Sequence, residues 1–235
     1  MKTKFLAAAL VAVALVITPT AALAQTRERP AASEERIDRV KARCLAQIDR
    51  RQRALEAEAN RLDQARGLSA EHKSALKQIN TQVSDGLEAL AAEIQGEDNA
   101  EELRAECRRI VEGFRVFTLV RPRTRVVIAS DRELAAVARL GSVAKRIQAA
   151  IDKAKADGRD TAEAEQHLAS MRSATDAAAG KAGGVYDDVI GLTAADYNAN
   201  HDVLKPSIAA VRDARNSIRT AISEARAARD ALKAE

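Results

Sequence analysis

The chain has 235 residues, of which 31% are charged and only 2% are aromatic, and its formal net charge is +4. Without the first 24 residues it holds 36 Lys and Arg against 34 Asp and Glu, a balance that gives no argument for nucleic-acid binding. Trp is absent, so a surface that stacks sugars or bases on aromatic rings is not expected. Ala, Arg, Glu, Leu and Asp dominate, and this mixture predicts an all-α fold.

Residues 1–24 have the pattern of a secretory signal peptide. Two lysines precede the apolar run 5–17, and Ala-Leu-Ala at 22–24 supplies the small residues that signal peptidase requires. Cleavage is predicted between Ala24 and Gln25. The alternative is a membrane helix, but the run is shorter than the roughly 20 residues that span a bilayer. Gln25 stands where a lipoprotein would need Cys, so we expect a secreted, extracellular protein.

The next part, residues 33–120, is expected to form a three-helix unit after a disordered tail at 25–32. Ser33, Ser69 and Asp98 or Asn99 have the character of N-caps, and glycines at 67 and 96 fit the intervening helix ends. Apolar residues recur at steps of three and four, which is the spacing of an amphipathic helix. In chain order these are Ile37, Val40, Cys44, Ile48, Leu55, Leu62, Leu76, Ile79, Val83, Leu87, Leu90, Ile94, Leu103, Cys107, Ile110, Phe114 and Phe117.

The helical period breaks at residues 121–130. Pro122 cannot continue a helix interior, and the β-branched run 126–128 favours extended backbone. We therefore predict a crossover segment here, strand-like in part, with Ser130 or Asp131 as the N-cap of the following helix.

The C-terminal helical unit is predicted over residues 131–235. Its first helix should end near Gly158, and its second should run from Thr161 to Ile190, weakened by glycines. A polar connector follows, and Pro206 opens the last helix in its first turn. The whole pattern predicts an elongated antiparallel helical bundle of about six long, coiled-coil-like helices, either as two three-helix units or as one continuous bundle.

The two cysteines, Cys44 and Cys107, are expected to form a disulfide. Counting along the helices from the turn near Gly67 places them level to within one or two turns, on the apolar faces of the first and third helices. An oxidising compartment favours the bond. The alternative is two buried free thiols, and on either interpretation the pair is structural, because a redox enzyme more often carries Cys-x-x-Cys.

A weak calcium-like pattern lies in the polar connector. Asp196, Asn198, Asn200 and Asp202 match the alternate oxygen ligands of an EF-hand loop. The positions that require Gly and a bidentate Glu hold other residues, so the simpler interpretation is a set of cap and turn residues. No metal site is predicted.

A group of arginines surrounds the predicted crossover and is a candidate anion-binding site. Arginines around a proline turn can hold phosphate, anionic lipid or an acidic polymer, whereas the usual alternative is a solvated face paired with nearby acids such as Glu101, Glu102 and Glu106. The candidate residues are Arg115, Arg121, Arg123 and Arg125.

The chain carries none of the sequence motifs for catalysis or cofactor binding considered next. The histidines at 72, 167 and 201 are far apart and match no zinc-binding pattern, no Gly-x-Ser-x-Gly elbow occurs, and the glycine-rich stretch 180–184 is not a P-loop. We expect a non-enzymatic protein without a cofactor. A hydrolase would require a deep pocket that brings one of these histidines against a carboxylate.

Two segments, FRVFTLVRPRTRVVIASDR (114–132) and LTAADYNANHDVLKP (192–206), resemble a loosely defined group of secreted all-helical proteins of high-GC Gram-positive bacteria. No activity has been assigned to that group. The resemblance implies an exported helical bundle over residues 33–235 and transfers no functional residue.

Two functions fit these expectations. The first is a secreted scaffold or protein–protein interaction protein of the cell envelope or extracellular space, acting on a protein partner or on a second copy of itself. The alternative is a membrane- or envelope-active protein that binds anionic lipid or polymer with an amphipathic face. Neither involves nucleic acid, and no apolar run after residue 24 is long enough to span a bilayer.

Overall fold

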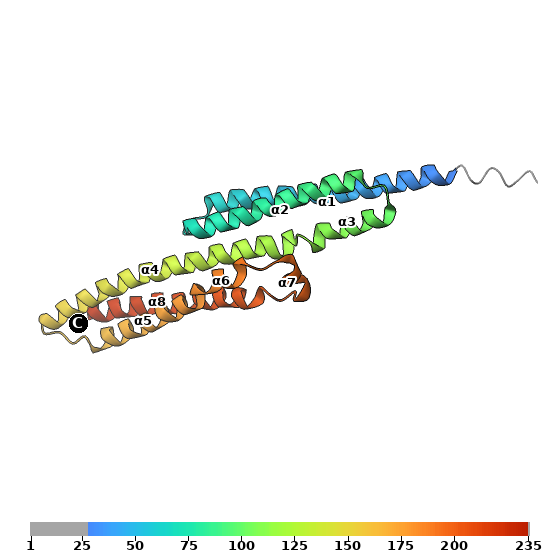
Figure 1. Cartoon of the computed structure of the whole chain (residues 1–235). Coiled ribbons are helices and arrows are strands. Elements are labelled where there is room, and N and C mark those ends of the chain that lie inside the picture. Colours follow the sequence, from blue (N-terminus) through green and yellow to red (C-terminus); the bar gives the residue numbers. More distant parts are fainter. Residues whose placement is uncertain (1–27, 235) are drawn as a thin grey trace, which may run out of the picture. The chain divides into compact units, whose positions relative to one another are not determined.

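The protein is all-α, as its composition predicts (Figure 1). The computed structural model describes residues 28–234, in which every regular element is helical. The predicted signal peptide, 1–24, and its cleavage point lie outside the described residues. The chain divides between Arg39 and Val40 into two units, and the contacts described below lie within the second.

Helix α1 (Glu28–Gln64) begins earlier than predicted. Residues 28–32 are helical, so the expectation of a disordered tail is wrong for them. Pro30 falls within the first turn, where backbone N–H groups have no partner inside the helix and proline is tolerated. In the second unit, α1 buries apolar residues one or two turns apart: Cys44, Ile48, Leu55 and Leu62.

Helices α2 (Ala70–Gly96) and α3 (Ala100–Glu112) begin at the predicted caps. The Ser69 hydroxyl accepts the His72 backbone N–H at 3.1 Å. The Asn99 side chain accepts from Glu101 N–H at 2.8 Å. Gly67 has a φ of +79° in the turn before α2, a conformation that favours glycine. These local signals therefore fix the two helix starts.

The predicted crossover at 121–130 is helical, and the expectation of strand-like backbone is wrong. The π-helix η1 (Val116–Val120) leads directly into α4 (Arg121–Ala156), and Pro122 lies in the first turn of α4. The run 126–128 is apolar because all three side chains are buried inside the protein. Ser130 and Asp131 are buried in the helix interior and do not cap it.

The last part contains more breaks than predicted. The expected helix from Thr161 to Ile190 is divided at Gly184 into α5 (Ala162–Gly183) and α6 (Val185–Ile190). The polar connector forms α7 (Ala194–Ala199), whose Thr193 and Asp196 make a capping box. Helix α8 (Lys205–Ala234) has Pro206 in its first turn, as predicted.

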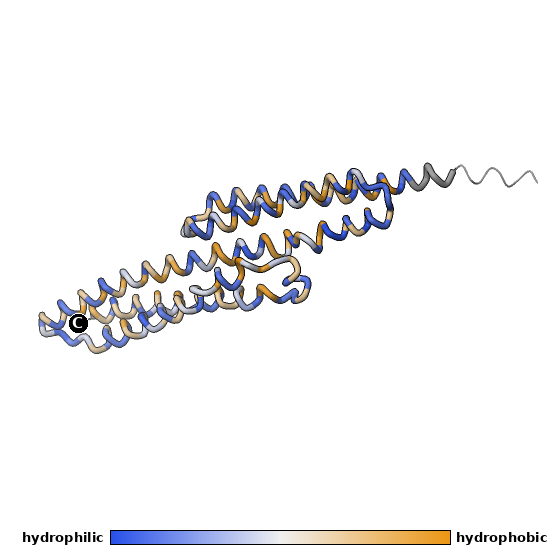
Figure 2. Tube along the Cα trace, in the orientation of Figure 1, coloured by the Kyte–Doolittle hydropathy of each residue, from blue (hydrophilic) through white to orange (hydrophobic). Residues whose placement is uncertain are grey.

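Helix α4 contributes to several apolar clusters, in one of which Val126 packs with Val185 and Val211. Its first half packs Val127 and Ile128 against residues of α1, α2 and α6, such as Leu62, Leu76 and Val189. Its second half packs against α5 and α8, which lie beside it in Figure 1. Apolar and polar residues alternate along the helices in Figure 2, as amphipathic helices require. None of the helices in the described range is both long and apolar enough to cross a membrane.

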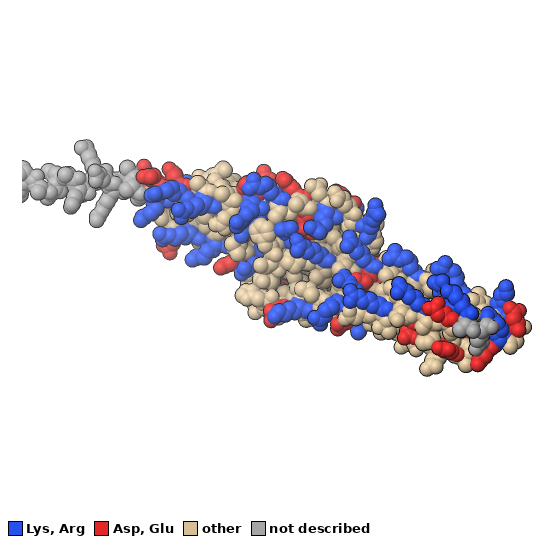
Figure 3. Space-filling model, turned by 180° about the vertical axis from the view of Figure 1, so that it is seen from behind, with Lys and Arg blue, Asp and Glu red and all other residues tan. Residues whose placement is uncertain are grey.

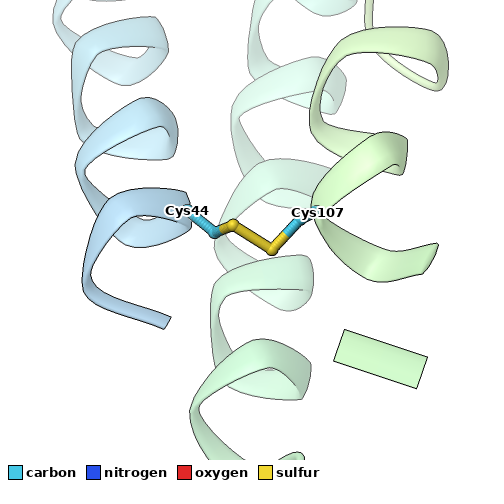
Figure 4. The surroundings of a disulfide bond; sticks show 2 residues. All are labelled: Cys44 and Cys107. Atoms are coloured by element: carbon cyan, nitrogen blue, oxygen red, sulfur yellow. A yellow bond between two sulfur atoms is a disulfide. The ribbon is translucent and has the colours of Figure 1, made fainter. Parts of the chain in front are cut away.

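Cys44 of α1 and Cys107 of α3 form the predicted disulfide (Figure 4). Their Cα atoms lie 5.6 Å apart, within the ordinary range for a disulfide. The bond links two residues that are 63 positions apart in the sequence. Cys44 is almost fully buried. The prediction from helical rise, that Cys44 and Cys107 lie at the same level on neighbouring helices, is therefore confirmed.

Candidate functional site

Three of the four candidate arginines have partners inside the protein. Arg115 has a φ of 43°, and its Nε donates to the Asn198 side chain at 2.5 Å. Its guanidinium lies 5.4 Å from the centre of the Tyr197 ring. Arg115 thus ties the end of α3 to α7 and is used in the fold.

Arg121 is the partner of a buried carboxylate. Its Nε lies 3.3 Å from Oε2 of Glu58, whose side chain is only 1% exposed. Arg61 approaches the other carboxylate oxygen at 3.5 Å. The Arg121 guanidinium also lies 5.8 Å from the centre of the Phe117 ring. This pair therefore joins α4 to α1 and leaves Arg121 with little capacity for an external anion.

Arg123 is buried and serves the backbone. Its Nη1 donates to the carbonyl oxygens of Leu192 at 2.8 Å and Ile190 at 3.2 Å, which lie at the end of α6. Burial lowers the pKa of the Arg123 guanidinium to about 10. The predicted grouping of four arginines into one anion site is therefore not what the structure shows.

Arg125 is the candidate that remains exposed, and it lies in a groove between α1 and α4. The groove has a volume of about 480 Å³, and its charged side chains are all arginines: Arg61, Arg125 and Arg132. Asn60 and Gln64 add amide groups to the lining. Among the described residues, no carboxylate lies within 4 Å of the guanidinium of Arg125 or Arg132. This lining suits a negatively charged ligand.

The residues of the calcium-like pattern are engaged in caps and ion pairs. Asp196 closes the capping box of α7, and Asn198 donates to the Glu112 carbonyl at 2.9 Å. Asn200 accepts from the backbone N–H of Asp202, whose carboxylate pairs with Lys205. Within residues 28–234, no group of three or more His, Cys, Asp or Glu side chains is placed to hold a metal ion.

Two histidines lie against carboxylates, which the sequence did not reveal. His72 Nδ1 lies 2.9 Å from Oδ1 of the buried Asp131, and its ring stacks on Tyr186 at 3.6 Å between centres. His167 Nδ1 lies 2.8 Å from Glu224. Neither histidine lines the arginine groove or the α4–α8 grooves described below, so the pairs have no adjoining substrate site among these grooves.

Asp131 instead connects the start of α2 to α4, because it accepts from both the Ser69 backbone N–H, at 2.8 Å, and the His72 ring. Replacing Asp131 with Ala should lower the free energy of unfolding by about 2 kcal/mol, since both donors lose their acceptor. Asp131→Asn keeps one acceptor oxygen and should lose less. Urea denaturation of the two variants measures the difference, and equal losses would contradict the assigned role.

The exposed face of α4 is basic over most of its length. Arg125, Arg132, Arg139 and Arg146 follow one another at intervals of seven residues and are all exposed. The acidic residues between Arg121 and Ile151 are Asp131 and Glu133, and both are buried. Between Arg121 and Ile151 this face therefore carries positive charge with no exposed carboxylate of the same stretch to balance it; the exposed Asp152 follows directly. We call these four residues the α4 ladder.

Helix α8 carries a second ladder with the same spacing: Arg212, Arg219, Arg226 and Lys233, which are also exposed. One groove between α4 and α8 brings Arg125 together with Arg212 and Arg215. A second groove, further along both helices, brings Arg146 together with Arg229. Because residue numbers rise along both helices from one groove to the other, α4 and α8 run parallel. Arg125 and Arg212, the first members of the two ladders, line the same groove.

Lys and Arg side chains are widespread on the face of the molecule shown in Figure 3.

No known protein family, curated protein or solved structure matches this chain. The function must therefore be inferred from the site itself.

Proposed function

We propose that this chain is an exported, non-enzymatic helical-bundle protein that binds an acidic partner on the basic face of α4. The sequence of residues 1–24 supports export, and a disulfide between Cys44 and Cys107 fits an oxidising compartment. The described helices form the framework that holds the basic face in place.

The observation that carries the proposal is the unbalanced charge of the α4 ladder. Several exposed arginines elsewhere pair with nearby acids, as Arg53 does with Asp49 and Arg109 does with Glu93. Along the α4 ladder the described residues place no carboxylate within ion-pair distance. A surface of one sign attracts ligands of the opposite sign, and it raises the rate at which they associate.

Neutralising part of this ladder should weaken binding of an acidic polypeptide. We expect Arg125→Gln, Arg132→Gln and Arg139→Gln together to lower the affinity for poly-glutamate by about tenfold or more at low salt, because three charge pairs are lost. Titration calorimetry of the exported protein measures this change. The matched control replaces Arg66, Arg104 and Arg108, three exposed arginines elsewhere, and removes the same charge.

The control variant should bind nearly as well as the unmodified protein. Equal losses in the two variants would show that only net charge matters and would overturn the assignment of the site. Absence of binding by the unmodified protein, even at low salt, would also overturn it.

The second candidate is binding to anionic lipid or to an envelope polymer. Ile208 and Ile222 of α8 are unusually exposed for large apolar side chains, at 48% and 38%, and arginines lie on both sides of them. An interfacial helix combines these features. Sedimentation with anionic and neutral lipid vesicles tests lipid binding, and polyphosphate serves as the anionic polymer. This second candidate is contradicted if the protein binds neither the anionic vesicles nor polyphosphate.

A further inference from the structure

The two grooves between α4 and α8 are lined by apolar residues as well as by arginines. On the α4 side Pro122 and Ala129 line the first groove, and Val143 and Ala150 line the second; these four positions are spaced in multiples of seven. On the α8 side Ile208 lines the first groove. Ile222, two heptads further along, repeats its position in α8. The floor is therefore built of small and apolar residues between two lines of positive charge.

The interval between successive charges in each ladder equals the rise of two turns of an α-helix. Seven residues rise about 10.5 Å along a helix, so each ladder presents a charge at that interval. An acidic residue repeated every seven positions in a third helix, aligned with α4 and α8, would meet one ladder at every second turn. Arg125 and Arg212 line the same groove, so such a helix could meet both ladders at that level.

The floor distinguishes between types of anionic ligand. A hydrophilic polymer gains nothing from Ile208 and Ile222, whereas a helix with an apolar stripe would remove them from water. Alanines on the α4 side allow the backbone of a docked helix to approach closely. A helix with one apolar stripe flanked by acidic residues therefore complements these grooves in shape and charge.

We propose that the partner presents an acidic amphipathic helix, which docks lengthwise along α4 and α8 across the two grooves between them and completes a four-helix arrangement with α4, α5 and α8. This proposal rests on the proposed function and specifies the partner that the basic face binds. The apolar stripe of the partner helix contacts the floor, and its acidic flanks pair with the α4 ladder and with Arg212, Arg219 and Arg226 of α8.

The test uses a designed peptide of about four heptads, since that length matches the ladders. Leu and Ala form its apolar stripe, and Glu occupies the flanking positions on both sides. A second peptide has the same sequence except that two central residues of its apolar stripe are replaced by proline, which prevents the helix and leaves the charge unchanged. Poly-glutamate of equal charge serves as the unstructured polyanion. Fluorescence anisotropy measures binding of each probe to the exported protein.

We expect the helical peptide to bind at least about tenfold more tightly than the proline peptide or poly-glutamate, since only the helix can use the floor and both rims together. Ile208→Ser with Ile222→Ser should remove most of this advantage and leave poly-glutamate binding unchanged. Both isoleucines are exposed, so these changes leave the folded core intact.

The outcomes separate the two proposals. Equal binding of all three probes would overturn the helix proposal and leave an anion-binding face. The same holds if the helical peptide binds and the isoleucine substitutions have no effect. Binding of anionic vesicles in preference to every peptide would assign the groove to lipid and overturn the helix proposal. Failure of all anionic probes would overturn both proposals.

Discussion

Replacing Cys44 and Cys107 with Ala is expected to lower the free energy of unfolding by about 4 kcal/mol. The bond closes a loop of 63 residues, and the chain-entropy account gives a loss of that size when such a loop is opened. The effect arises mainly in the unfolded chain, which gains conformations when the link is removed. Guanidinium denaturation of the protein without residues 1–24, with and without the substitutions, measures the loss.

Reduction of the unmodified protein provides the control for this prediction. It breaks the bond without changing a residue and should reproduce most of the loss. A change below about 1 kcal/mol in both experiments would contradict a structural role for the disulfide.

Replacing Arg121 with Met is expected to lower the free energy of unfolding by about 3 kcal/mol. The long apolar side chain retains much of the packing, but the Glu58 carboxylate, 1% exposed, loses the guanidinium that lies 3.3 Å away. Removing one partner of a buried ion pair costs about 3–5 kcal/mol, and the loss here lies at the lower end because Arg61 still approaches the other carboxylate oxygen at 3.5 Å. Thermal and denaturant unfolding both report the loss.

A double-mutant cycle makes this prediction specific. Replacing Glu58 with Leu in the Arg121→Met background removes the buried charge and should recover most of the stability. If Arg121 acted only through packing, the second substitution would not restore stability. Additive losses in the double variant would therefore contradict the role of the pair.

The helix ends that local chemistry determines could be predicted from the sequence. Ser69 and Asn99 are caps in the structure because their side chains accept backbone N–H groups within three residues. The disulfide could be predicted because helical rise converts residue counts into distances. In each case the signal and the structure it produces lie close together, or are joined by a regular helix.

The prediction of extended backbone at residues 126–128 is wrong because burial of these side chains outweighs their β-branched strand propensity. Val126, Val127 and Ile128 are all buried in a helix that is surrounded by other elements, and packing of this kind overrides a β-branched preference. Ser130 was assigned as an N-cap because it follows that run. In the structure its hydroxyl donates to the Ala182 carbonyl on another helix, at 2.8 Å.

The arginine prediction was only partly correct, for a related reason. Arg121 and Arg123 are close to Arg125 in sequence, but in a helix they point in different directions and reach Glu58 and the end of α6. The residues that share an exposed face are seven positions apart. That interval was visible in the sequence, whereas the alignment of α4 with α8 depends on the fold.

The central claim is that the α4 ladder receives an acidic partner, and NMR of the arginine Nε–Hε groups tests it most directly. During titration with the helical acidic peptide, the signals of Arg125, Arg132 and Arg139 should shift and saturate together, and those of Arg66 and Arg104 should stay unchanged. Shifts of similar size at all exposed arginines, or saturation confined to arginines outside α4 and α8, would contradict the claim.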